Sequence, residues 1–292
     1  MPSCTPGGST TQHYGFCLPA DGEINWGTAW RSTMTAIDDA IFNVGIPRSY
    51  LAGLQTTPTV ASTSISIAVG VAMGNDQATS ITLTSPIVKV LSSTWAVGTG
   101  NGGLTAATSI QGNQTYHLFA ILRTDTDVVD AYYDTSAAAA NIPSPYTIYR
   151  RLASLKTSTS TNMVNYVQDG DFFQLYHPFL ETTAAAPGTN GVTQTLVGVP
   201  SGVSFRVLLN TAGTGGVAND AYLSDPSTED LAPSLTISPL SSNAGQAAVN
   251  QSPSAQLVCK TNTSAQIRYR LTVNQQLRLC TWGWIDTRGK DA

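Results

Sequence analysis

The chain has 292 residues, enough for two domains of ordinary size, and only 11% of them are charged, against roughly 25% in a typical soluble domain. Its 14 lysines and arginines and 18 aspartates and glutamates give a net charge of −4, and Arg150-Arg151 is the one basic cluster, so nucleic-acid binding is not expected. No apolar run approaches the roughly 18–20 residues of a membrane span, and residues 1–30 carry no signal-peptide pattern, so neither membrane insertion nor classical secretion is expected.

Residues 1–58 are predicted to form an N-terminal arm, a helix and a linker. Residues 1–22 are rich in Pro, Gly, Ser and Thr, which is typical of an irregular arm, and residues 46–58 are the linker. Between them, Asn25 is a good N-cap and Gly45 a good stop for a helix. The residues that share one face of this helix recur at steps of four, three, four and four: Trp26, Trp30, Thr33, Ile37 and Ile41.

This face of the helix needs a covering surface. An isolated helix of about 18 residues is marginal in water, so a stripe that begins with two tryptophans must be buried. One alternative is that the stripe packs on the β-structure of its own chain. The other is that it packs against further copies of the same helix, which would make the helix an oligomerisation element.

From residue 59 onward the apolar period changes from 3.6 to 2, which predicts strands of an antiparallel sandwich. Ile65 and Ile67 alternate with polar neighbours. The run His117–Leu122 is apolar on both faces, which is typical of a central strand, and Val128–Tyr133 is its predicted hairpin partner. We assign the first β-domain to residues 59–180.

A second antiparallel β-domain is assigned to residues 181–292, entered through a linker at Glu181–Asn190. Strands are expected around the alternating residues Val203–Leu209 and in the late set 255–285, with Asn274-Gln275-Gln276 as a hairpin connection. Residues 224–254 are rich in Ser, Pro, Ala and Asn and are predicted to form a long loop or weak strands. The predicted fold class is therefore mainly β, with an N-terminal arm and a single helix followed by two antiparallel β-sandwich-like domains.

The four cysteines fall into two pairs. Cys4 and Cys17 lie in the arm, where an oxidised cross-link within or between chains would stabilise an attachment. Cys259 and Cys280 are predicted on strands of one sheet, and the alternatives there are a disulfide or two buried free thiols. Neither spacing matches a zinc site, and the histidines are scattered, so we expect no metal centre.

Catalysis has little support in the sequence. No nucleophile-elbow pattern lies near a histidine, and the chain has only three glutamates, all far apart. Asp125, Asp127 and Asp130 resemble the start of a calcium loop but lack its Gly and distal Glu, so a polar hairpin turn is predicted. The segment Gly98–Gly103 lacks the Lys-Ser/Thr of a phosphate loop, so a flexible hairpin tip is predicted there. We expect no enzyme activity and no cofactor.

Carbohydrate contact stays open, because several large amphipathic rings suit stacking on sugars. These rings are Trp95, Tyr132, Tyr133, Trp282 and Trp284. Trp282 and Trp284 have the same parity and are therefore expected on one face of their strand. The alternatives are a polysaccharide-binding surface, for which Trp95, Trp282 and Trp284 are the candidates, or packing in a core or subunit interface.

Several segments resemble parts of tailed-bacteriophage virion fibre and spike subunits, such as tail or collar fibres. The Asn25-Trp26-Gly27 start followed by Ile37-Asp38 is similar to their short N-terminal helical segment. The blocks 116–130 and 146–155 and the ending 282–289 resemble recurrent β-domains of tail proteins. The resemblance implies a helix that attaches the fibre to the particle or bundles its chains, and a homotrimer.

We therefore expect a structural protein of the virion, assembled in the host bacterial cytoplasm. Its arm and helix would bind other proteins of the tail, baseplate or neck and bundle three chains, and its β-domains would adhere to host-surface polysaccharide. Two alternatives remain: a head or neck (collar) decoration protein without host contact, and a tailspike-like enzyme that degrades glycans.

Overall fold

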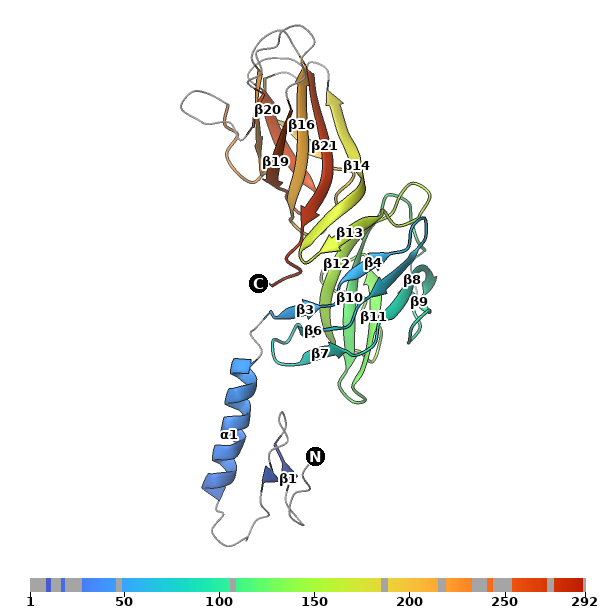
Figure 1. Ribbon diagram of the computed structural model, residues 1–292, viewed down its shortest axis with the longest axis vertical. Helices are drawn as coiled ribbons and strands as arrows, with labels where there is room; N and C mark the ends of the chain where they lie inside the picture. Colours follow the sequence, from blue (N-terminus) through green and yellow to red (C-terminus); the bar gives the residue numbers. More distant parts are fainter. Residues whose placement is uncertain are drawn as a thin grey trace.

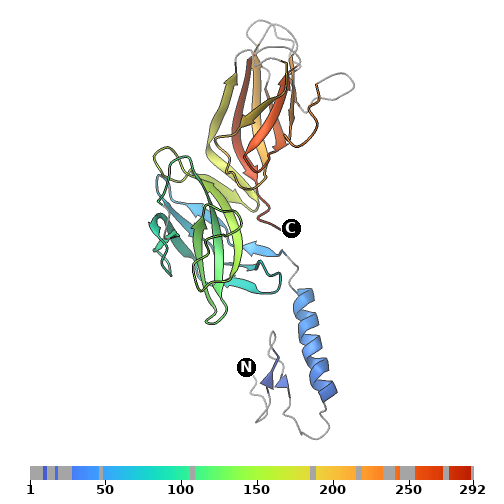
Figure 2. The ribbon, with the colours of Figure 1, turned by 180° about the vertical axis from the view of Figure 1, so that it is seen from behind.

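The computed structural model describes residues 9–11, 17–18, 28–45, 49–105, 109–184, 189–214, 219–232, 241–243, 254–271 and 276–290. These residues are mainly β-structure with one helix, α1, which confirms the predicted fold class. Figures 1 and 2 show α1 at one end and two β-regions stacked beyond it. We call the sheets formed by residues 49–157 the first β-region and those formed by residues 166–285 the second β-region.

Helix α1 spans Thr28–Gly45 and ends at the predicted glycine, while its predicted N-cap, Asn25, lies outside the described residues. Two short antiparallel strands of the arm precede it: β1 (Ser9–Thr10) and β2 (Cys17–Leu18). The hydroxyl of Thr11 donates to Asp38 Oδ1 at 2.7 Å, and both side chains are buried. The arm therefore contacts the helix.

The first β-region consists of a seven-stranded and a three-stranded sheet. The seven-stranded sheet has the order β12 (Ile148–Lys156), β10 (Thr115–Arg123), β11 (Val128–Asp134), β9 (Gly102–Leu104), β8 (Ile87–Thr94), β5 (Ser64–Ile67), β4 (Thr56–Pro58). The three-stranded sheet has the order β3 (Leu51–Gly53), β6 (Gly70–Met73), β7 (Ser80–Leu83). Strands β3 and β4 lie in the predicted linker, so the β-structure begins before residue 59.

Strand β10 is buried on both faces, as its sequence predicts. Every residue from Thr115 to Leu122 is buried, and the strand forms the expected hairpin with β11. One face joins the main core, while Phe119 and Ile121 on the other face pack with Tyr132 and Tyr146 in a second cluster. The absence of polar alternation in this strand thus has a physical cause, since neither face meets water.

Strand β9 departs from the antiparallel prediction, because it runs parallel to both of its neighbours, β8 and β11. Residues 95–101 fold back over β8 instead of forming a hairpin tip. The Trp95 amide donates to Leu104 O at 2.6 Å, and the Gly100 amide donates to Val88 O at 2.8 Å.

A buried lysine holds this folded-back segment in place. The side chain of Lys89 is 0% exposed, and its ammonium donates to Ala96 O at 2.7 Å, to Gly98 O at 3.0 Å and to Asp130 Oδ2 at 3.0 Å. All three N–H groups of the ammonium are thereby used. Burial lowers the pKa of Lys89 and raises the pKa of Asp130, and their ion pair opposes both shifts.

The second β-region is a sandwich of two antiparallel sheets. The five-stranded sheet has the order β13 (Tyr166–Asp169), β14 (Phe172–Ala184), β21 (Gln276–Ile285), β16 (Arg206–Thr214), β19 (Ser254–Lys260). The four-stranded sheet has the order β15 (Val192–Thr195), β20 (Gln266–Leu271), β17 (Asn219–Ser224), β18 (Ser241–Asn243). The main core cluster runs through both β-regions without interruption.

The predicted boundary at residues 180 and 181 is wrong, because it falls inside the 13-residue strand β14. Glu181, placed in a linker by its small polar neighbours, is buried, and its carboxylate accepts hydrogen bonds from the amides of Val197 and Gly198. Pro178 is tolerated within this strand because the pairing with β21 is interrupted between Gln174 and Phe179.

The predicted hairpin at Asn274-Gln275-Gln276 is also wrong. Strand β20 before it belongs to the four-stranded sheet and β21 after it to the five-stranded sheet, so the chain crosses between the layers of the sandwich here. Residues 272–275 lie outside the described residues. Most of the stretch 224–254, predicted as a long loop or weak strands, also lies outside them, apart from residues 225–232 and strand β18.

Replacing Lys89 by methionine should lower the free energy of unfolding by about 3–5 kcal/mol, because the buried carboxylate of Asp130 would lose its counter-charge. Chemical denaturation of the wild type and the variant measures this difference. The control is Arg123→Met, which removes an ion pair with Asp125 at the surface and should leave stability nearly unchanged. Equal stability of Lys89→Met and the wild type would contradict the role assigned to this lysine.

Candidate functional site

The most elaborate polar site among the described residues lies where the two β-regions meet. A cavity of about 370 Å³ opens there, between strand β12 of the first β-region and the ends of β16, β19 and β21 of the second. Its chemically active lining residues are Arg151, Ser204, Arg206, Lys260, Asp286 and Thr287. Residues from four separate parts of the chain therefore contribute to one site.

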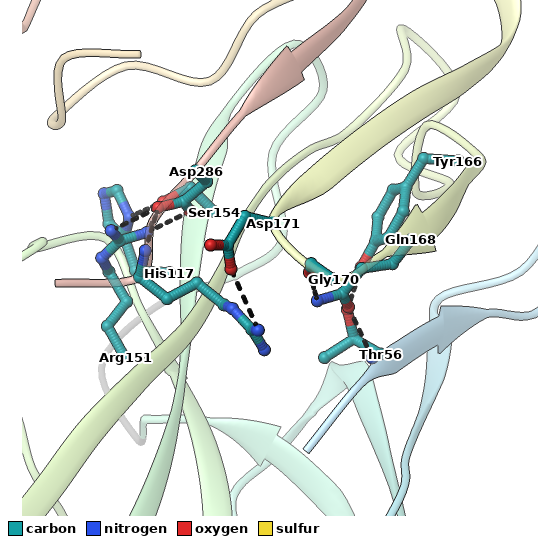
Figure 3. Close-up of polar contacts among 10 residues, drawn as sticks. Thr56, His117, Arg151, Ser154, Tyr166, Gln168, Gly170, Asp171 and Asp286 are labelled. Carbon is teal, nitrogen blue, oxygen red and sulfur yellow. Dashed lines mark hydrogen bonds and ion pairs between the residues drawn. The ribbon is translucent and has the colours of Figure 1, made fainter. Parts of the chain in front are cut away.

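An ion pair between Arg151 and Asp286 forms part of the cavity lining. Arg151 Nη1 lies 2.6 Å from Asp286 Oδ2, and Arg151 Nη2 lies 2.7 Å from Asp286 Oδ1 (Figure 3). The two side chains are 12% and 2% exposed. Parallel charge-assisted hydrogen bonds of this kind are the strongest side-chain contacts and fix the geometry of both groups. They join strand β12 to the segment that follows β21.

Behind the ion pair lies a buried serine–histidine contact. Arg151 Nη1 donates to Ser154 Oγ at 2.9 Å, and Ser154 Oγ lies 2.8 Å from His117 Nδ1 (Figure 3). Ser154 is 0% exposed and His117 1% exposed. Because the hydroxyl is covered on all sides, this pair is a structural contact in the folded chain and not an accessible nucleophile.

The environment of His117 keeps its ring neutral. Burial, and secondly the positive charge of Arg151, lower the pKa of His117 to about 4, against the opposing charges of Asp286 and Asp134. The ring also contacts the second β-region, since a Cβ added at Gly202 would lie 2.7 Å from His117 Nε2. Protonation would therefore place a charge inside the junction.

A second set of contacts ties strand β4 to strand β13. The hydroxyls of Thr56 and Tyr166 lie 2.7 Å apart, and the amide of Thr56 donates to Gln168 Oε1 at 2.7 Å (Figure 3). Tyr166 also packs against Phe173, which stacks on Trp284 with ring centroids 5.6 Å apart. The polar contacts of Thr56 join the two β-regions, and the aromatic contacts fix Tyr166 within the second one.

Two further arginines are buried beside this junction. Arg288 is 3% exposed and Arg150 is 7% exposed. Arg288 Nη2 pairs with Asp171 Oδ1 at 3.2 Å, and Arg150 Nη2 donates to Ser49 O at 2.9 Å. Burial, and then the charges of Arg151 and Arg288, lower the pKa of Arg150. The junction thus concentrates positive charge in a chain whose net charge is negative.

The predicted attachment stripe is only partly described. Trp30 is 44% exposed and Ile37 is 42% exposed, and Thr33 is also exposed. Trp26 lies outside the described residues, as does the side chain of Ile41. In Figure 1, α1 stands apart from the sheets of both β-regions.

The predicted cysteine pairs have different outcomes. Cys259 and Cys280 lie in one sheet, as predicted, but both are free thiols. Strand β16 separates β19 from β21, so the two cysteines are at least two strand spacings apart, roughly 9–10 Å, which exceeds the Cα separation of a disulfide. They are also offset along the strands, because Cys259 pairs with Val207 and Cys280 with Asn210 of β16. Burial raises the pKa of Cys259 to about 12, so its thiol is protonated at neutral pH. Cys4 and the side chain of Cys17 lie outside the described residues.

The predicted shared face of Trp282 and Trp284 is wrong. A bulge in β21, where Gly283 pairs with Leu208 but Thr281 pairs with Leu209, shifts the alternation by one residue. Trp282 packs on Phe172 and is half-buried, whereas Trp284 packs in the core on the other face and is 1% exposed.

Burial excludes most of the candidate sugar-stacking rings in this fold. Tyr132 and Tyr133 are 0% exposed, and Trp284 is enclosed in the core. Trp95 is half-buried, and its Nε1 donates to Ala131 O at 3.0 Å, while its ring meets Tyr146 edge to face. Trp282 and Trp95 thus retain only partly accessible rings.

The aspartates of the predicted hairpin turn do not converge. Asp125 and Asp127 lie in the exposed turn between β10 and β11, as predicted, and Asp125 pairs with Arg123. The assignment of Asp130 to this turn is wrong, because Asp130 lies within β11, where it is buried and pairs with Lys89. No cluster of three or more metal-binding side chains occurs among the described residues. Within the same residues, no helix has the length and apolarity needed to cross a membrane.

Sequence reasoning did not find the cavity. Its only signal was the Arg150-Arg151 pair, because the other members are distributed between residues 204 and 289. Comparisons with protein families, curated proteins and solved structures gave no match. The site is therefore interpreted from its own geometry.

Stability should fall as the pH is lowered from 6.5 towards 4. The folded pKa of His117 lies below its unfolded value, so the unfolded chain binds more protons in this window, and stability increases with pH across it. The full shift corresponds to roughly 3 kcal/mol. Chemical denaturation across the pH range should show a flatter profile for His117→Asn than for the wild type.

The matched control is His177→Asn, which changes an exposed histidine of strand β14. Its stability profile should run parallel to that of the wild type. Parallel profiles for His117→Asn and the wild type would show that His117 does not couple the junction to pH.

Proposed function

We propose that this chain is a structural subunit of a bacteriophage virion, a trimeric fibre or spike that attaches to the particle by its N-terminus. The observation that carries the proposal is α1, an 18-residue helix whose side chains Trp30 and Ile37 are 44% and 42% exposed. The segment around Trp26 and Ile37 resembles the attachment helices of fibre subunits. The proposals that the particle is a phage virion and that three chains associate rest on this resemblance.

Helix association has a clear driving force. Fully burying an aliphatic side chain of the size of isoleucine contributes roughly 1.5–3 kcal/mol, and a tryptophan ring has a larger area to bury. Three helices packed around a common axis would bury this stripe from each chain and complete helices that are marginal alone. The arm contacts α1 through the hydrogen bond between Thr11 and Asp38, so it would lie beside the helix bundle in the trimer.

The β-regions suit projection from such a bundle. They stack beyond α1 in Figure 1, and the continuous core and the Arg151–Asp286 pair join them. A chain with only 11% charged residues and many hydroxyl groups is compatible with weak, reversible contact to polysaccharides. In this proposal the β-regions perform adhesion to the host surface, and the mature location is the virion.

The tailspike-like enzyme remains the less favoured alternative. The buried Ser154–His117 pair is closed to substrate, and the carboxylate of Glu181 is held by two backbone amides. A decoration protein of the head or neck is separated from an adhesin by adsorption: blocking the β-regions with antibody fragments would slow attachment to the host only for an adhesin.

Replacing Trp30 and Ile37 together by serine should convert a trimer into monomers at micromolar concentration, because the apolar contact between helices is lost. Sedimentation equilibrium of the full chain, with and without reductant, measures the mass. The control variant carries Val60→Ser and Val258→Ser, which change apolar residues that are 65% and 55% exposed on the β-regions, and it should remain a trimer.

A wild type that is monomeric in every condition would refute the trimer. A complementary truncation should begin at Ser49, since a start at residue 59 would remove strands β3 and β4 from the first β-region. Loss of the trimer only on reduction would assign assembly to the cysteines of the arm and contradict the role given to Trp30 and Ile37.

A further inference from the structure

We propose that the cavity between the two β-regions binds the carboxylate of an acidic sugar. This inference rests on the proposed function, because it names the class of surface polysaccharide that such an adhesin would contact. The cavity itself, about 370 Å³ in volume, lies within the range of roughly 300–1,000 Å³ that is usual for ligand pockets.

The charge of the lining points to an anion. Three cationic side chains and one carboxylate line the cavity, whereas the whole chain carries −4. The carboxylate of Asp286 is already engaged by two hydrogen bonds from Arg151. Arg206 and Lys260 therefore provide the charge that is available to a ligand.

Strand pairing places these two cations next to each other. Arg206 pairs directly with Lys260 on β19 and with Ile285 on β21, so the three side chains are cross-strand neighbours on one face of the sheet. Like charges directly opposite each other are destabilising. Lys260 is 63% exposed and has a long 3.4 Å contact with Asp225, while Arg206 forms no ion pair within the described part of the chain. A bound carboxylate would neutralise this repulsion.

The wall of the cavity is fixed before any ligand arrives. The amide of Asp286 donates to Asp171 O at 2.8 Å, and the amide of Arg288 donates to Asp286 Oδ1 at 2.8 Å. Asp171 also pairs with Lys290 at 2.7 Å. A ligand site built on such a constrained segment loses little entropy on binding.

The rest of the lining suits a sugar ring. Ser204 and Thr287 also line the cavity, and half-buried Val203 and Ile285 offer apolar surface. The Ser204 hydroxyl donates to Thr261 O and keeps its acceptor lone pairs for a ligand. A pyranose has polar edges and an apolar C–H face, so a mixed lining of this kind accommodates it better than a purely charged one would. The combination distinguishes an acidic saccharide from a simple inorganic anion.

The test is isothermal titration of the full-length wild type with trigalacturonate, galactotriose and inorganic phosphate. We expect binding of trigalacturonate alone. The double variant Arg206→Gln with Lys260→Gln should lower the affinity about 10-fold or more, since each substitution removes a donor to a charged group. The control is Arg278→Gln, an exposed arginine elsewhere on strand β21, which should bind as the wild type does.

Each other outcome overturns the inference. Equal affinity for phosphate and trigalacturonate would show that the cavity takes any anion, and equal weakening by Arg278→Gln would show non-specific attraction. Unchanged affinity in the double variant would place the sugar elsewhere. Because α1 is untouched, a trimer that fails to bind refutes only this inference, and a monomer that binds trigalacturonate refutes only the trimeric fibre.

Discussion

The buried ion pair between Arg151 and Asp286 is the contact on which the arrangement of the β-regions depends. It joins two segments 135 residues apart, and its side chains are almost entirely removed from water. The same guanidinium donates to Ser154, which contacts His117, and its charge lowers the pKa of that histidine. Because removing one partner would leave an uncompensated buried charge, the junction is complete only when both are present.

Two other buried charges, Lys89 and Glu181, follow the same physical rule. Lys89 donates hydrogen bonds to two backbone carbonyls and to Asp130, and Glu181 accepts hydrogen bonds from two backbone amides. In each case the charged group satisfies main-chain atoms of an irregular segment that no strand partner reaches. A chain with few charged residues thus places several of them inside, where they determine the path of loops.

Helix α1 and the junction between the β-regions have different chemical characters. At the N-terminal end, α1 presents apolar side chains, which suits association with other helices. At the junction, rigid strands present Arg206 and Lys260 beside a saturated ion pair, which suits recognition of an anion. In the proposed fibre these are separate tasks, attachment and adhesion, and the continuous core joins the two β-regions on either side of the junction.

Local periodicity by itself determined α1, the hairpin of β10 and β11, and the burial of Ile65 and Ile67. In each case the local order of polar and apolar residues already shows which faces of the element are buried. Only the tertiary structure decided that β14 continues through residue 181, and that a bulge sends Trp282 and Trp284 to opposite faces, since both follow from pairing between strands that are distant in the sequence. The cavity belongs to the second group. Its cations come from β12, β16 and β19, and their proximity is a property of strand order, which no local pattern encodes.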